Sequence, residues 1–182
     1  KWKNPYPQRG ERTLVTVKKK GGSAKTESAV AAALGWLVRH QEDDGSWDAD
    51  GWTTHCEGEA CGGPSTSEAG VGESQYDVGV TSLALLAFLG QGNTHLGGPY
   101  KIQVRKGLRW LMGQQDARGA VGLAKDAGAT TYSHALAAIV FCEAFSLTGD
   151  LQLATPAENA IDACLAMQTE DMGWKYGYDS GK

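Results

Sequence analysis

Three segments of the sequence repeat one pattern, in which a glutamine is followed by a glycine and then by a bulky apolar residue. The copies are Gln41, Gly45 and Trp47; Gln115, Gly119 and Val121; and Gln168, Gly173 and Trp174, the last with one additional residue between glutamine and glycine. In the first two copies a tryptophan, Trp36 or Trp110, precedes the glutamine by five residues. A unit that recurs along a chain indicates a repeat protein, in which neighbouring copies bury one another's apolar faces.

Apolar residues at helical spacing surround these copies. The predicted helices cover residues 27–40, 78–90, 101–114, 133–147 and 156–168. The first, third and fifth have a single apolar face, and Thr26 is the expected N-cap of the first. The second and fourth are apolar on most sides, so we expect them to be enclosed by the others. This alternation predicts an all-α fold of outer and inner helices.

The inner helices repeat as well, although less clearly than the glutamine segments. One opens with Tyr76 and Asp77, and the next opens with Tyr132, Ser133 and His134, 56 residues later. The glutamines are 74 and then 53 residues apart. A glycine-rich insertion around residues 48–75 accounts for the longer first interval.

The glutamine and tryptophan spacing resembles the QW repeat of squalene and hopene cyclases, which protein prenyltransferase β-subunits share in weaker form. The likeness covers residues 27–178 and implies α/α toroid-type helical hairpins. In that family the glutamine amide bonds backbone groups at helix ends and the tryptophan packs over it. The resemblance therefore assigns structural roles to the repeat residues: Trp36, Gln41, Gly45, Trp47, Trp110, Gln115, Gly119, Gln168, Gly173 and Trp174.

The expected organisation is a basic arm or linker over residues 1–25, then a repeat domain over residues 26–182. The arm is expected to be irregular, with one short strand over residues 13–17, and carries eight Lys and Arg against Glu11 alone. About five helices make a partial barrel. We expect its open end to be covered by more of a longer chain, a partner protein or a second copy.

The catalytic motifs of the resembling enzymes are missing from this sequence. Their cyclases begin the reaction with an Asp-x-Asp-Asp motif on an inner helix, and the nearest string here, Asp48 and Asp50, lies in a loop. Asp162 and Cys164 have the spacing of two prenyltransferase zinc ligands, but they lie within an outer helix and no histidine follows. The resemblance therefore supports the fold more than the chemistry, and no cofactor is expected.

Four residues near the starts of the inner helices are the candidates for a ligand site. These are Tyr76, Asp77, Tyr132 and His134, because inner-helix N-termini line the central cavity in the resembling family. Asp77 and His134 are also the two catalytic candidates. The alternative is structural: Asp77 caps its helix and His134 bonds a neighbouring repeat.

A third cluster lies in the insertion. Cys56 and Cys61 are close enough in sequence to form a disulfide, which would indicate an extracytoplasmic protein. His55 with the same two cysteines offers three ligands for a metal, whereas structural zinc usually requires four. Free thiols are the remaining alternative.

The balance of charge argues against nucleic-acid binding, because the chain carries a net −4 despite its basic arm. No apolar stretch is long enough to span a membrane. Two functions remain open. One is a non-catalytic module that binds a partner or an isoprenoid-like ligand on its concave face, and the other is a fragment of an isoprenoid-acting enzyme whose acid motif lies outside this chain.

Overall fold

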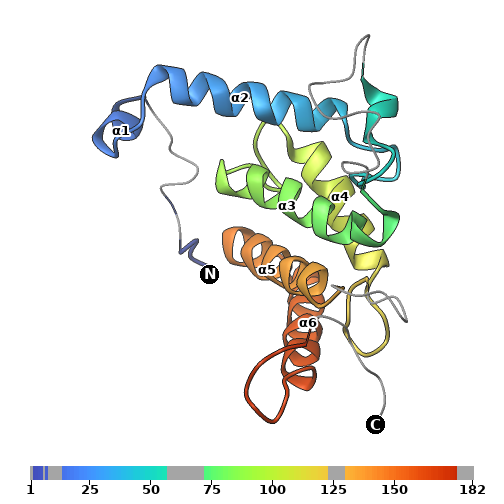
Figure 1. Ribbon diagram of the computed structural model, residues 1–182. Helices are drawn as coiled ribbons and strands as arrows, with labels where there is room; N and C mark the ends of the chain where they lie inside the picture. Colours follow the sequence, from blue (N-terminus) through green and yellow to red (C-terminus); the bar gives the residue numbers. More distant parts are fainter. Residues whose placement is uncertain (1, 6, 8–13, 57–71, 123–129, 176–182) are drawn as a thin grey trace.

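The computed structural model describes residues 2–5, 7, 14–56, 72–122 and 130–175, and every regular element in these ranges is helical (Figure 1). The α-helices are α1 (Leu14–Lys19), α2 (Ala24–Arg39), α3 (Asp77–Gly90), α4 (Lys101–Gly113), α5 (Thr130–Thr148) and α6 (Ala154–Ala166). Short 3-10 turns are η2 (Trp52–His55), η3 (Ser74–Tyr76) and η4 (Leu151–Leu153). The all-α prediction is confirmed.

Helices α3 and α5 form the centre of the fold. They lie side by side, with α2 and α4 packed against α3 and with α6 packed against α5 (Figure 1). Leu85, Phe88 and Leu89 of α3 and Val140 and Phe141 of α5 have no exposed surface. These two helices are apolar on most sides because other helices cover them on most sides.

The outer helices bury one face each, as their single apolar stripes predict. In α4, Val104 and Leu111 are fully buried, whereas Arg105 and Arg109 on the other faces are exposed. None of the helices in the described ranges is long and apolar enough to cross a membrane.

The arm departs from the sequence prediction, because residues 14–19 form the short helix α1 instead of a strand. A strand requires a neighbouring strand to satisfy its backbone, whereas this segment folds back on itself. The Gly22 N–H donates to the Val17 carbonyl over 2.9 Å. Helix α2 also begins earlier than predicted, because Ser23 is its N-cap and exchanges hydrogen bonds with Thr26.

Candidate functional site

The three glutamine segments form loops of the same shape after α2, α4 and α6. In each loop the residue after the glutamine donates its N–H to the carbonyl four residues further on, over 2.8–2.9 Å. Position four after the glutamine has a positive φ in all three: +105° at Gly45, +85° at Gly119 and 63° at Met172. We call these segments loop 1 (residues 41–47), loop 2 (115–121) and loop 3 (168–174).

The shared geometry corrects the register predicted for the third copy. Met172, not Gly173, takes the place of Gly45 and Gly119, so loop 3 has no additional residue. The Gln168 side-chain amide donates to the Met172 carbonyl over 3.1 Å, as the two earlier glutamines do at Gly45 and Gly119. A methionine thus occupies a conformation that costs a side chain roughly 1–2 kcal/mol.

The first two glutamines also reach the next outer helix. Gln41 Nε2 donates to the Gly45 and Gln103 carbonyls, each over 3.0 Å. Gln115 Nε2 donates to the Gly119 and Pro156 carbonyls, also over 3.0 Å each. Each amide therefore joins its own loop to the first turn of the outer helix that follows in the chain.

The tryptophans, rather than the glutamines, bond the ends of their own helices. Trp47 Nε1 donates to the Leu37 carbonyl and Trp174 Nε1 donates to the Cys164 carbonyl, both over 2.8 Å. Trp110 has a different role, because it is partly buried and packs against the hydrophobic core. Trp36 stacks on the His40 ring with 3.8 Å between centroids.

Loops 1 and 2 are also each held by an inner helix. The Trp47 N–H donates to the Thr81 hydroxyl over 2.9 Å, and the Val121 N–H donates to His134 Nδ1 over 3.0 Å. Thr81 and His134 are therefore equivalent. Each precedes the next glutamine of the repeat, Gln115 or Gln168, by 34 residues. The repeat has a period of 53 residues in both layers, so the 56-residue offset between the tyrosines does not mark equivalent positions.

His134 uses both ring nitrogens within the fold. Nδ1 accepts from Val121, so Nε2 carries the proton and donates to the Ala160 carbonyl over 3.1 Å. Cys164 Sγ lies 3.2 Å from the same nitrogen, which has no lone pair to accept the thiol proton. Burial lowers the pKa of His134, which favours the neutral ring. The histidine links loop 2 to α6, in keeping with the structural alternative.

Asp77 does not cap its helix, although it begins α3. Its Oδ1 accepts the Ala49 N–H over 2.9 Å and so holds the start of the insertion. Burial raises the pKa of Asp77, and the carboxylates of Asp48 and Asp50 raise it further. No hydrogen bond joins Asp77 to His134 among the described residues, and Tyr132 is 58% exposed. Asp77 therefore bonds the insertion, whereas His134 bonds loop 2 and α6.

Asp48, Asp50 and Asp77 could together hold a hard cation, because one oxygen of each lies within 4.8 Å of the others. Two of them already have backbone partners. Asp48 Oδ1 accepts from the N–H groups of Asp50 and Gly51, and Asp77 accepts from Ala49. The backbone hydrogen bonds of Asp48 and Asp77 therefore help to shape the start of the insertion.

His55 and Cys56 of the insertion contact different side chains. His55 Nε2 lies 2.6 Å from the Glu42 carboxylate, and Cys56 Sγ lies 3.6 Å from His40 Nε2. Cys61 lies outside the described residues, so the disulfide and the three-ligand metal site stay predictions.

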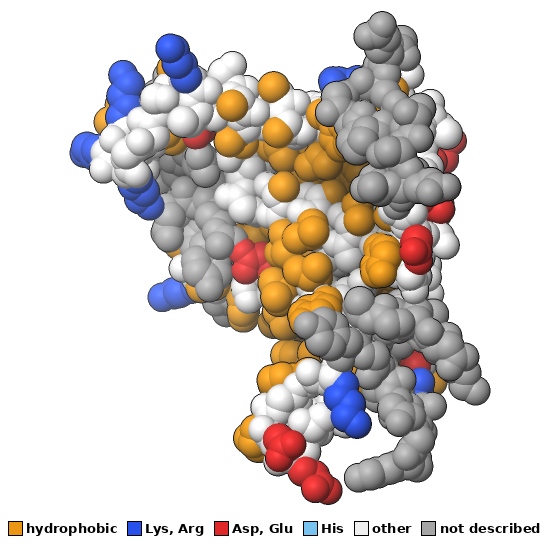
Figure 2. All heavy atoms as spheres, viewed as in Figure 1, with side chains coloured by type: hydrophobic (Ala, Val, Ile, Leu, Met, Phe, Trp, Pro, Cys, Tyr) orange, Lys and Arg blue, Asp and Glu red, His pale blue; other side chains and the backbone are white. Residues whose placement is uncertain are grey.

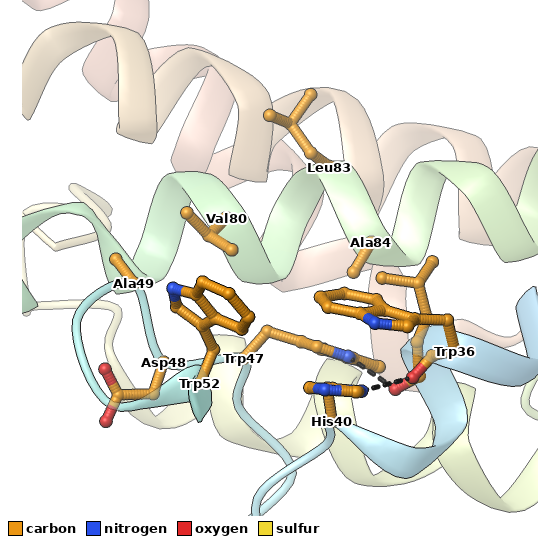
Figure 3. A pocket seen from close by; sticks show the side chains of 10 residues that line it. Trp36, His40, Trp47, Asp48, Ala49, Trp52, Val80, Leu83 and Ala84 are labelled. Atoms are coloured by element: carbon orange, nitrogen blue, oxygen red, sulfur yellow. Dashed lines mark hydrogen bonds between the residues drawn. The ribbon is translucent and has the colours of Figure 1, made fainter. Parts of the chain in front are cut away.

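A pocket of about 480 Å³ lies between the end of α2, the insertion and α3 (Figure 3). Its lining residues are Trp36, Leu37, His40, Trp47, Asp48, Ala49, Trp52, Val80, Leu83 and Ala84. The rings of Trp36 and Trp52 face α3, whereas the Asp48 carboxylate points away from them (Figure 3). The pocket is therefore aromatic on one side and aliphatic on the other.

The surface around the pocket is also apolar. Orange side chains gather over the middle of the face on which α2, α3 and α5 lie (Figure 2). Val80 and Leu83 of α3 are 36% and 55% exposed, although they lie on an inner helix. The sequence did not indicate this pocket, because Trp36 and Trp47 fit the repeat pattern and Trp52 belongs to no motif.

No family model, curated protein or solved structure matches the chain.

Proposed function

We propose that this chain is a non-catalytic α/α repeat module that binds an apolar, isoprenoid-like ligand in the pocket beside α3. The observation that carries the proposal is the pocket of about 480 Å³ with three tryptophans in its wall. Small-molecule sites commonly measure about 300–1,000 Å³ and are lined mainly by apolar and aromatic side chains.

The lining supports an apolar ligand over a charged one. Its polar side chains are His40 and Asp48, and both have partners within the fold. His40 Nδ1 bonds the Trp36 carbonyl over 2.8 Å, and Asp48 bonds backbone N–H groups of the insertion. A ligand that covers Leu83 and the Trp52 ring removes apolar surface from water, at about 25 cal/mol per Å².

The repeat geometry supports the structural part of the proposal. Gln41 and Gln115 each bond a loop carbonyl and the next outer helix, as the resemblance to the QW repeat implies for structural glutamines. Inner and outer helices alternate along the chain, which is the order that toroid-type hairpins require. In this proposal the chain forms part of such a ring, and the pocket lies on its concave side.

Farnesol, a neutral isoprenoid alcohol, is a suitable probe for a titration followed by calorimetry. We expect saturable binding that Leu83→Asp weakens by about tenfold or more, because a carboxylate in an apolar contact must lose its hydration. Leu83 is 55% exposed, so the substitution should leave folding intact. Leu151→Asp is the matched control, because Leu151 is 79% exposed and does not line the pocket. Equal binding by both variants would contradict the proposal.

The second candidate, a fragment of an isoprenoid-acting enzyme, is favoured by one observation. Burial raises the pKa of Asp77, which favours the protonated carboxyl that an acid catalyst needs. Incubation with squalene or farnesyl diphosphate, with and without zinc or magnesium, separates the two candidates. Product that disappears in Asp77→Asn or His134→Ala would favour the enzyme, and we expect none.

A further inference from the structure

Two contacts of one kind hold successive outer helices together, and we call each a joint. In the first, loop 1 lies on α4: Gln41 bonds the Gln103 carbonyl, and a Cβ on Gly45 would lie 2.5 Å from the Lys106 backbone. In the second, loop 2 lies on α6: Gln115 bonds the Pro156 carbonyl, and a Cβ on Gly119 would lie 2.1 Å from the Asn159 carbonyl oxygen.

Loop 3 has the shape of a joint, but no outer helix in the described part of the chain lies on it. Its internal hydrogen bonds match those of loops 1 and 2, and Gln168 bonds the Met172 carbonyl. Within the described part of the chain, Gln168 bonds no outer helix. Trp174 is 53% exposed, whereas Trp47 at the equivalent position is 3% exposed. Loop 3 therefore already has the geometry in which its glutamine amide could donate to an outer helix.

Among the described residues, helix α2 is the outer helix on which no glutamine loop lies. In α4 and α6 the carbonyl that accepts the glutamine amide, that of Gln103 or Pro156, lies 12 residues before the glutamine that follows the same helix. The residue whose backbone the loop glycine approaches, Lys106 or Asn159, lies 9 residues before that glutamine. The same count from Gln41 leads to Ala29 and Ala32. Both are exposed, and alanine permits the close approach that a joint requires.

The charges at the two ends are complementary. Loop 3 carries Glu170 and Asp171, both exposed. The end that leads into α2 is basic, and its exposed lysines are Lys18, Lys19, Lys20 and Lys25. Opposite charges at the two ends favour contact between different ends of two copies and disfavour contact between like ends.

We propose that loop 3 of one copy docks on α2 of a second copy at Ala29 and Ala32, and so repeats the joint between molecules. Gln168 Nε2 donates to the Ala29 carbonyl of the second copy, and the Met172 backbone lies against Ala32. The two surfaces differ, so the association is head-to-tail.

Sedimentation over a range of protein concentrations tests the docking. We expect the average mass to rise with concentration and to fall with added salt, because salt screens exposed charges. Ala32→Glu and the double variant Gln168→Ala with Asp171→Lys should each weaken association by roughly tenfold or more, since both place like charges in contact. Ala31→Glu, on the adjoining face of α2, is the matched control and should associate normally.

Mixing the two deficient variants gives the decisive result. Each retains the end that the other has lost, so an equimolar mixture should associate, whereas each variant alone should stay monomeric. A wild-type chain that is monomeric at every concentration would overturn the proposal. So would a mixture that stays monomeric, or a closed dimer that neither variant weakens. Farnesol binding by the monomeric variants keeps this result separate from the proposed ligand function.

Discussion

Replacement of Gln115 by alanine removes the two hydrogen bonds that join loop 2 to α6. The side-chain amide donates to the Gly119 and Pro156 carbonyls over 3.0 Å each. An intramolecular hydrogen bond contributes about 0.5–1.5 kcal/mol net, so the two together contribute about 1–3 kcal/mol. We expect Gln115→Ala to lower the free energy of unfolding by that amount.

Urea unfolding followed by circular dichroism measures the loss, with Gln114→Ala as the control. Gln114 is exposed and its side chain does not join two elements, so its replacement should change stability by less than about 0.5 kcal/mol. At dilution, Gln168→Ala should also cost less than Gln115→Ala, because Gln168 bonds a single carbonyl of its own loop. Equal stability of the Gln114 and Gln115 variants would refute the role assigned to the amide.

Three further predictions concern the repeat and its titrating groups. Met172→Gly should stabilise the chain by about 1 kcal/mol and Gly119→Met should destabilise it, because both positions have positive φ; thermal melts of the pair check this. Burial raises the pKa of Asp77, so ionisation of this carboxyl disfavours the fold as pH rises through the raised pKa. Asp77→Asn should therefore raise the melting temperature near pH 7, with a gain that vanishes near about pH 3, where the carboxyl is protonated in both states. Burial lowers the pKa of His134 below its ordinary 6.5, so protonation as pH falls through the lowered pKa costs stability. His134→Gln should show a smaller fall in melting temperature between about pH 7 and pH 5 than the wild type.

The helices could be predicted because apolar spacing reports burial directly. Helices α3 and α5 are apolar on most sides in the sequence, and their residues Leu85, Phe88 and Phe141 have no exposed surface. The arm could not be predicted in the same way. Val15 and Val17 favour a strand by residue type, but no neighbouring strand exists in the described ranges and local bonds form α1 instead.

The glutamine loops could be predicted as structural elements, but not their register or their partners. Matching glycine to glycine placed Gly173 in the third copy, whereas equal spacing from the glutamine leads to Met172. The 53-residue period of the inner helices becomes visible only when Thr81 and His134 are seen to accept equivalent N–H groups. A threonine and a histidine share no sequence signal that marks them as equivalent.

The pocket could not be predicted because its walls come from separate parts of the chain. Trp36 belongs to α2, Trp52 belongs to the insertion, and Leu83 belongs to α3. The glycine-rich composition of the insertion indicates a loop and does not indicate where Trp52 lies. An unassigned tryptophan in a long insertion was the one available signal.

The most direct test of the ligand site is a farnesol titration followed through the indole N–H resonances of the six tryptophans. We predict that the signals of Trp36 and Trp52 shift and saturate, because both rings line the pocket. The signals of Trp110 and Trp174 should stay in place, because neither residue lines it. Unchanged signals at all positions, or shifts at Trp174 equal to those at Trp52, would contradict binding at this pocket.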